Sequence, residues 1–132
     1  MKIIDKLAWI EIKDKKILST RSKGKDTYYI PGGKREGDES DANALIREIE
    51  EELSIKLNAS SLKPFGVFEA QAHGKTEGIL VRMTCYTGNY TGEIRPNSEI
   101  EEVVWFTHKD RDRSSPVDKI IFDYCKTKNL ID

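Results

Sequence analysis

Cysteine and histidine are scarce in this sequence, which limits the cross-links and metal sites that it can build. The two cysteines, Cys85 and Cys125, lie far apart among apolar neighbours. This excludes a disulfide framework or a zinc site and predicts reduced thiols in or near the core. The two histidines, His73 and His108, form no ligand-spaced pair. A metal site would therefore use carboxylates, which favour magnesium or manganese over zinc.

Long apolar runs and an excess of one charge are also missing. No stretch approaches the roughly 18 apolar residues that cross a bilayer, and charged residues interrupt residues 1–5, so neither a membrane span nor a signal peptide is expected. The formal net charge of −1 argues against electrostatic binding to nucleic acid polymers or anionic membranes. We expect a cytoplasmic protein with neither kind of partner.

The composition is typical of one globular domain. Of 132 residues, 37% are hydrophobic and 34% are charged, which is enough to bury a core without cross-links. The sequence contains no internal repeat, low-complexity tract or interdomain linker. Residues 1–132 are therefore expected to form a single domain.

The segment from Gly33 to Ile55 contains the most informative pattern. Glu48, Glu51 and Glu52 crowd one face of a predicted helix. Like charges at these spacings repel, and anions near a helix C-terminus oppose its dipole. A divalent cation would turn this repulsion into attraction, whereas the simpler alternative is a solvated acidic face. An apolar stripe lies beside the acidic one: Ala42, Leu45, Ile46, Ile49 and Leu53.

The residues before this helix predict a turn and a helix start. Pro31 followed by Gly32 and Gly33 indicates a rigid turn whose backbone can lie close to a metal or phosphate. The residue that caps the helix is expected to be Asp38 or Ser40.

Together these residues resemble the Nudix box, the signature of the Nudix hydrolases. Ser54 stands where that pattern has a glycine in the left-handed conformation, which serine adopts only at a steric cost. The chain looks like a MutT-like, single-domain member. The resemblance implies an α/β (α+β) fold, the Nudix-type α/β/α sandwich with a mixed β-sheet between helices. The matching positions are Gly33, Glu39, Arg47, Glu48, Ile49, Glu51, Glu52 and Ile55.

The resemblance also implies the chemistry. Family members hydrolyse a nucleoside diphosphate linked to another group by attack of water on phosphorus. Arg47 and Glu39 would orient the loop against the helix, although Arg47 has the alternative of a surface pair with Glu51. The implied cofactor is Mg²⁺, or Mn²⁺ in its place, held by these oxygen donors: Gly33, Glu48, Glu51 and Glu52.

The general base stays open, because the family places it either in the box or on a later loop. Within the box, the candidates for this catalytic role are Glu51 and Glu52. Beyond it they are Glu99, Glu101 and Glu102, of which Glu99 is preferred because its surroundings are loop-like.

Residues that contact the substrate are the least determined. Arg21 is equally a candidate phosphate ligand and a solvated cation. Tyr28, Phe68 and Tyr86 are candidates to stack on a base, with core packing as the alternative. Trp105 is expected in the core.

The short chain favours a small-molecule nucleotide as substrate, most simply a nucleoside triphosphate that is cleaved to a monophosphate and pyrophosphate. The protein is expected to be a monomer or a homodimer. The alternatives are hydrolysis of ADP-ribose, a nucleotide sugar or a dinucleoside polyphosphate, a Nudix-like sensor that binds without hydrolysis, and a structural interaction domain. The sensor is less favoured because no box carboxylate is missing.

Strands are expected at residues 6–12, 17–20, 28–30, 65–72, 79–86 and 102–106. We expect the first two to form a hairpin around the charged turn 13–16, and the fourth and fifth to form another around the turn 74–78. Ser115 as N-cap, Pro116 as first helical residue and Asp118 predict a final helix. Its expected core stripe is Val117, Ile120, Ile121, Tyr124 and Cys125.

Overall fold

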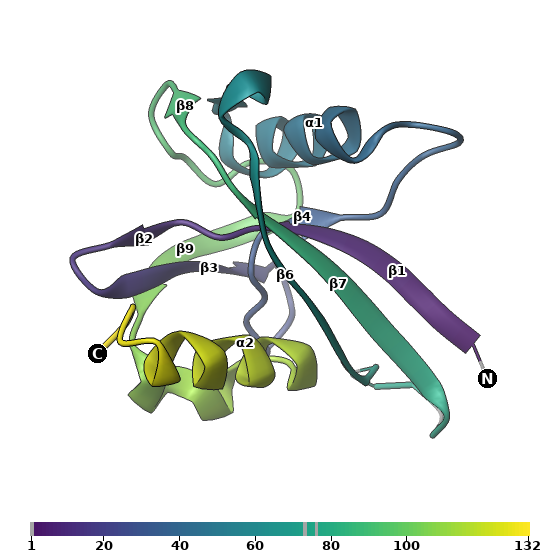
Figure 1. Ribbon diagram of the computed structural model, residues 1–132, viewed down its shortest axis with the longest axis vertical. Coiled ribbons are helices and arrows are strands. Elements are labelled where there is room, and N and C mark those ends of the chain that lie inside the picture. The colour runs from purple at the N-terminus through teal and green to yellow at the C-terminus, as the bar shows by residue number, and fades with distance from the viewer. Residues whose placement is uncertain (1, 73, 76) are drawn as a thin grey trace.

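The computed structural model describes residues 2–72, 74–75 and 77–132; one of the two histidines noted above, His73, lies outside them. Most of the described elements are strands, with one long helix in the middle of the chain and another near the C-terminus (Figure 1). In chain order they are β1 (Lys2–Trp9), β2 (Ile12–Lys13), β3 (Lys16–Ser22), β4 (Gly32–Gly33), α1 (Asp41–Leu53), β5 (Lys56–Leu57), η1 (Ala59–Ser61), β6 (Lys63–Gln71), β7 (Ile79–Thr87), β8 (Tyr90–Thr91), β9 (Ile100–Phe106), η2 (His108–Arg113) and α2 (Pro116–Thr127).

The longest strands form a mixed sheet. Its order is β4-β1-β7-β6, with β1 and β7 parallel and the two outer pairs antiparallel. A second, antiparallel sheet contains β2, β3 and β9, and the short strands β5 and β8 pair with each other. A mixed sheet flanked by helices is the fold class that the sequence predicts.

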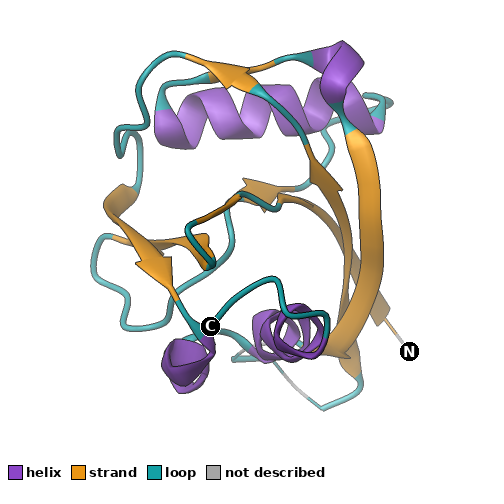
Figure 2. Ribbon diagram, turned by 60° about the vertical axis from the view of Figure 1, so that its left-hand side comes forward, coloured by secondary structure: helices purple, strands orange, loops and turns teal. Residues whose placement is uncertain are grey.

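The two long helices cover opposite sides of the strands (Figures 1 and 2). Successive side chains of a strand point to opposite faces. Leu7 and Trp9 of β1 accordingly pack in one core cluster with residues of α1, while Ala8 and the following Ile10 pack in a second cluster with residues of α2. The chain thus has two apolar layers, one on each side of the mixed sheet.

The expected N-terminal hairpin is wrong in its first strand. β1 ends at Trp9 and pairs with β7 and β4, not with β3. The segment Leu7 to Ile10 is buried, and a strand buried on both faces belongs in the interior of a sheet rather than in an edge hairpin. Only β2 pairs with β3, across a turn in which Asp14 and Lys15 have positive φ.

The pairing of the two strands in the second expected hairpin is confirmed, while one residue of its expected turn, Thr76, lies outside the described residues. β6 and β7 pair antiparallel along most of their length, with a register shift between Pro64 and Gly66. β9 begins at Ile100, earlier than expected, because this buried residue pairs with Ser22. Residues 28–30 were expected as a strand but form only isolated bridges, one of them between Thr20 and Tyr29.

Helix α2 begins as the sequence predicts, with Ser115 as N-cap and Pro116 in the first turn. Asp118 lies in the first turn of α2, as the sequence predicts, and makes a further contact. It is fully buried, and its Oδ2 accepts a hydrogen bond from the Ile30 N–H at 2.7 Å. This carboxylate therefore joins α2 to the segment before β4.

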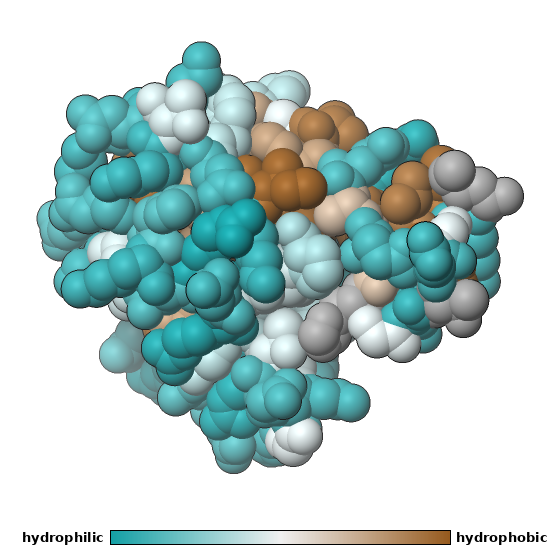
Figure 3. Space-filling view, turned by 90° about the horizontal axis from the view of Figure 1, so that it is seen from below, coloured by the Kyte–Doolittle hydropathy of each residue, from teal (hydrophilic) through white to brown (hydrophobic). Residues whose placement is uncertain are grey.

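The core stripe of α2 is partly different from the expected one. Ile120 and Tyr124 are 40% and 38% exposed, whereas Phe122 is fully buried. Val117, Ile121, Phe122 and Cys125 also follow helical spacing, and only one of two overlapping stripes can face the sheet. The molecular surface on this side is largely hydrophilic with a hydrophobic area (Figure 3).

The two cysteines are free and buried, as expected. Within the described ranges, no helix combines the length and apolar character needed to cross a membrane.

Candidate active site

The start of helix α1 is fixed by polar contacts. Ser40 is the N-cap, since its hydroxyl accepts a hydrogen bond from the Asn43 N–H at 3.1 Å. Asp41 accepts hydrogen bonds from Arg35 at 2.8 Å and from the Tyr86 hydroxyl at 2.7 Å. Tyr86 therefore joins β7 to α1, a position that favours a structural contact over stacking on a base.

The end of α1 is a left-handed turn. Ser54 has φ 62° and ψ 24°, and its N–H donates a hydrogen bond to the Glu50 carbonyl at 3.0 Å. This is the conformation for which the box pattern has glycine, so the serine keeps the turn at a cost in backbone strain.

The three glutamates of α1 lie in different environments. Glu52 is only 8% exposed, the side chain of Glu48 is 19% exposed and that of Glu51 is 50% exposed. Burial raises the pKa of Glu52 to about 8, although a hydrogen bond from the Gly32 N–H at 3.2 Å opposes the rise. Burial also raises the pKa of Glu48, against the opposing effect of Arg47. The donors and cations that the protein places near Glu48 and Glu52 therefore do not offset the cost of burying these two carboxylates in their charged form.

Arg47 lies at the centre of a charge network. Its Nε and Nη2 donate to the two carboxylate oxygens of Glu39 at 2.9 and 2.8 Å, and Nη2 also donates to the Lys34 carbonyl at 3.1 Å. Its Nη1 reaches Glu48 at 2.9 Å and Glu51 at 3.2 Å. The hydrogen bonds from Arg47 lower the pKa of Glu39 to about 2. This bidentate pair fixes the loop before α1 against the helix.

Strand β4 lies between β1 and the glutamates. A Cβ at Gly33 would overlap the Glu48 carboxylate, and one at Gly32 would overlap the backbone of Leu7. Gly32 also has a φ of 152°, a conformation that side chains disfavour. The two glycines therefore permit the close approach of β4 to both neighbours.

The carboxylates are held apart rather than gathered. Glu52 contacts Gly32, whereas Glu48 and Glu51 contact Arg47. Across residues 2–72, 74–75 and 77–132, no three side chains of histidine, cysteine, aspartate or glutamate form a group that could hold a metal ion. A cavity of about 210 Å³ nevertheless opens beside Glu52 and is also lined by Gly33.

The three glutamates near β9 are not equivalent. Arg21 forms ion pairs with Glu101 at 3.4 Å and with Glu102 at 3.3 Å. Glu99 instead lies close enough to Glu48 and Glu52 for its charge to raise the pKa of both. The arrangement therefore favours Glu99 over the other two as a group near the box.

The structure does not bring the three proposed substrate ligands to the cavity beside Glu52. Arg21 is occupied by its ion pairs. Tyr28 is 6% exposed, donates its hydroxyl to Glu102, and packs against Phe106 with 4.9 Å between ring centroids. Phe68 lies in an aromatic cluster with Tyr124 on the α2 side. Core packing is thus the better interpretation of both rings.

Trp105 was expected in the core. It is partly buried and packs against the α1 cluster, with the Lys13 ammonium 5.7 Å from its ring centre.

Sequence reasoning missed three residues that line the cavity beside Glu52: Lys6, Tyr29 and Met83. One signal was present. Side chains of a strand alternate between faces, so Lys6 shares a face with Ala8 and therefore points a cation toward the α2 side of a central strand. The other two residues become neighbours only through strand pairing.

The chain matches one family model, described as the NUDIX domain, over residues 7–124. A search of curated protein sequences finds no match.

Several solved structures have the same fold. The E. coli ORF135 protein has a TM-score of 0.72 and 25% identity, over 93% of this chain and 88% of that chain. A MutT NUDIX hydrolase from Burkholderia pseudomallei has a TM-score of 0.68 and 24% identity, over 83% of this chain and 86% of that chain. An ADP-ribose pyrophosphatase from Streptococcus suis has a TM-score of 0.55 and 19% identity, over 80% and 75%.

Proposed function

This chain belongs to the NUDIX domain family and is a Nudix pyrophosphohydrolase, and we propose that it cleaves nucleoside triphosphates to a monophosphate and pyrophosphate. The observation that carries the proposal is a pair of carboxylates whose pKa burial raises: Glu48, which packs against Gly33, and Glu52, which accepts the Gly32 N–H beside an open cavity. A solvated acidic face would have neither the burial nor the cavity.

The donor set fits a divalent cation. Carboxylate oxygens and a backbone carbonyl are the ligands that magnesium and manganese prefer. Glu48, Glu51 and Glu52 would supply the carboxylates, and Gly33 the carbonyl. To bind the cation, the glutamate side chains would have to leave their present contacts with Arg47 and Gly32. When bound, the cation neutralises charge on the diphosphate and makes a bound water a better nucleophile.

The protein's own residues have separable tasks in this proposal. Arg47 and Glu39 hold the loop between Gly33 and α1 against the helix. Glu99 is our choice for the residue that removes a proton from the attacking water, because Arg21 neutralises Glu101 and Glu102. Glu51 and Glu52 remain the alternatives within the box. We also propose a cytoplasmic protein that acts on small nucleotides, as a monomer or homodimer, without a nucleic acid polymer or membrane partner.

The substrate is tested with a panel of nucleotides. The four ribonucleoside triphosphates, ADP-ribose, a UDP-sugar and a dinucleoside tetraphosphate are incubated with the protein in magnesium, in manganese and in chelator. We expect metal-dependent release of pyrophosphate from at least one triphosphate. Turnover of ADP-ribose with a kcat/KM tenfold above that of every triphosphate would assign the chain to the branch suggested by the Streptococcus suis structure. Tight nucleotide binding with no turnover would support a sensor instead.

A further inference from the structure

Strand β1 has a neighbour along only part of one of its edges. On one side it pairs with β7 at every position from Lys2 to Trp9. On the other side β4 pairs only with Leu7 and Ala8. Figure 1 shows the half of β1 that leads to the N-terminus extending beyond β4. Residues 2–6 therefore form a free edge of the mixed sheet, which no strand of the described chain covers.

The backbone groups on this free edge follow from the strand pairing. The Trp9 N–H donates to the Pro31 carbonyl, next to β4, at 3.0 Å, whereas the Ile10 N–H donates to a carbonyl of β7 at 2.9 Å. Backbone groups of successive strand residues point to opposite edges, and the register with β7 is continuous. The N–H and C=O groups of Ile3 and Asp5 therefore face the free edge. Both residues are exposed, so these donors and acceptors are open to an added strand.

The surface beside the free edge is positively charged. Lys2, Lys34 and Lys75 line a groove of about 380 Å³ there. Their ammonium groups form no ion pair with a carboxylate of the described residues. Asp5 also lines the groove, but its carboxylate lies 2.7 Å from the Arg35 guanidinium, which compensates its charge. The groove therefore has an excess of positive charge.

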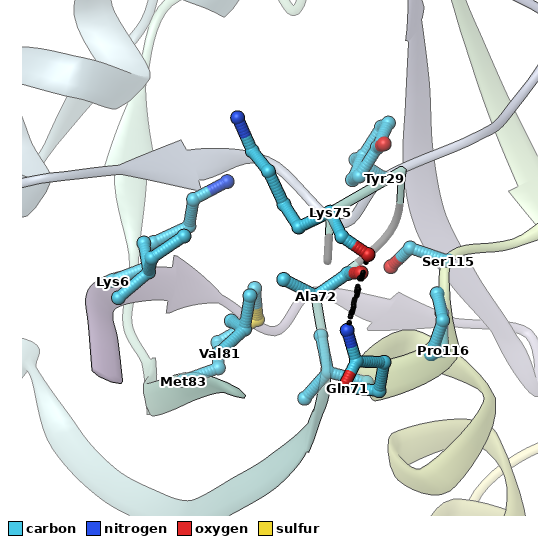
Figure 4. Close-up of a pocket in the computed structure, with 11 residues that line it drawn as sticks. Lys6, Tyr29, Gln71, Ala72, Lys75, Val81, Met83, Ser115 and Pro116 are labelled. Atoms are coloured by element: carbon cyan, nitrogen blue, oxygen red, sulfur yellow. Dashed lines mark hydrogen bonds between the residues drawn. The ribbon is translucent and has the colours of Figure 1, made fainter. Parts of the chain in front are cut away.

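Lys6 adds a cation at the end of the free edge that is next to β4. Lys2 and Lys6 are separated by an even number of positions on β1, so their side chains share the face toward α2. Lys6 and Lys75 both line a smaller cavity on that face, and Figure 4 shows their ammonium groups on the same side of it. The whole chain has a net charge of −1, so this concentration of cations is local and attracts acidic ligands.

The backbone and the charges together decide which partner the free edge suits. A second copy paired antiparallel over residues 2–6 would place Lys2 opposite the second copy's Lys6, and like charges directly opposite each other destabilise a sheet. A phosphate chain would compensate the lysines but has no donors for the backbone carbonyls. An extended peptide with acidic side chains at alternate positions can pair with the backbone and place its carboxylates opposite the lysines.

We propose that the free edge of β1 binds an extended acidic segment of a partner protein, which joins the mixed sheet antiparallel to β1 and in line with β4. Residues of the segment that lie opposite Lys2 and Lys6 carry carboxylates. The residues between them lie opposite Ile3 and Asp5 and form the backbone hydrogen bonds. This interaction is independent of the substrate proposed above.

Synthetic peptides test the proposal. The probe is a fluorescein-labelled octapeptide that alternates glutamate and valine, and a lysine–valine counterpart tests the sign of the charge. Two further forms of the probe have N-methyl groups, one on its valines and the other on its glutamates. In the proposed antiparallel pairing the valine N–H groups face β1 and the glutamate N–H groups face away from it. Only the valine-methylated form should therefore lose binding.

Fluorescence anisotropy gives the dissociation constants for the wild-type protein, Lys2→Glu and Lys56→Glu. Lys56 is exposed and lies outside the groove, so its variant controls for the change in net charge. The wild type and Lys56→Glu are expected to bind the glutamate peptide about tenfold or more tightly than the lysine peptide, because opposed like charges are costly. Lys2→Glu should reduce this preference severalfold.

Hydrogen exchange locates the peptide. Exchange at the Ile3 and Asp5 amides should slow when the glutamate peptide is added, whereas the amides of β6, the opposite outer strand of the sheet, should not change. Equal binding of the two N-methylated forms would show attraction by charge alone. Slow exchange at Ile3 and Asp5 that requires only a higher protein concentration would show that a second copy covers the edge. Either result, or a glutamate peptide that binds no more tightly than the lysine peptide, overturns the proposal.

Discussion

Glu52 and Asp118 are the two acidic residues that the described part of this fold buries, and their surroundings differ. Glu52 lies beside a cavity with other carboxylates nearby, whereas Asp118 lies under α2 and accepts the Ile30 N–H. Burial raises the pKa of Glu52 to about 8 and that of Asp118 to about 7. The first arrangement is suited to a cation, and the second joins two segments of the fold.

Asp118 predicts a pH dependence of stability. Its pKa in the folded protein, about 7, lies above the ordinary value of 3.8, so the folded state binds the proton more tightly and this residue's contribution to stability falls as pH rises from about 4 to 7. Asp118→Asn keeps an oxygen for the Ile30 N–H without the charge. We expect the variant to become more stable than the wild type by a few kcal/mol at pH 8, since one pKa unit is about 1.4 kcal/mol. Denaturant titrations between pH 4 and 8 measure the difference.

Asp123 on the same helix is the matched control. Hydrogen bonds from Arg111 lower its pKa, so its contribution is present at neutral pH and is lost in acid. Asp123→Asn should therefore be less stable than the wild type at pH 8 and converge with it as pH falls. A constant stability difference between Asp118→Asn and the wild type at all pH values would contradict the prediction for Asp118.

The close contacts of β4 with β1 and α1 explain why glycine stands at positions 32 and 33. β4 is only two residues long, yet it contacts β1 on one side and the α1 glutamates on the other. Arg47 and Glu39 hold the intervening loop. The local part of this arrangement was predictable from the sequence, because helix spacing, caps and turn residues act over a few positions.

Gly32→Ala is predicted to lower the stability of the fold, whereas Gly33→Ala is predicted to lower activity. A methyl group at Gly32 would overlap the Leu7 backbone, which has no room to move, so we expect a loss of more than about 2 kcal/mol of stability. At Gly33 it would overlap the end of the Glu48 side chain, which can rotate. That variant should stay folded and lose at least tenfold in kcat. Denaturant titration and the pyrophosphate assay separate the two, and similar losses of stability in both would contradict this account of β4.

The end of α1 gives a third prediction. Because Ser54 is left-handed, Ser54→Gly should stabilise the protein by up to about 1 kcal/mol with little change in activity. Ser54→Ala is the control, since it removes the hydroxyl without relieving the backbone and should bring no gain. A lower denaturant midpoint for Ser54→Gly than for the wild type would count against a strained turn.

At the scale of the whole molecule, the limits of the sequence come from contacts between distant segments. The parallel pairing of β1 with β7 joins residues about 77 positions apart, and no local pattern specifies it. The misassigned hairpin and the missed position of Lys6 follow from that pairing, since it places Lys6 beside Met83 in the wall of the cavity beside Glu52. Likewise, Tyr28 and Phe68 were attractive candidates for stacking only until the fold placed them in packed clusters.

The central claim is that the acidic face of α1 binds a divalent cation. Without metal, Glu51→Gln should equal or slightly exceed the wild type in stability, since it relieves like-charge repulsion worth a few tenths of a kcal/mol. Glu52→Gln should exceed the wild type by more as pH rises toward 8, because burial raises the pKa of Glu52 to about 8 and the amide avoids the cost of a buried charge. With magnesium, the wild type should gain stability as RT ln(1 + [L]/Kd), about 2.7 kcal/mol at a hundredfold excess over Kd. Each variant should gain less, because it has one anionic ligand fewer.

Thermal unfolding of the three proteins, in chelator and over a magnesium titration, tests this claim most directly. The account predicts a magnesium-dependent rise in Tm that is largest for the wild type and smaller for both variants. It also predicts that kcat of each variant is orders of magnitude below that of the wild type. Equal rises in Tm for all three proteins, together with unimpaired turnover, would show that this face is solvated surface and would contradict the account.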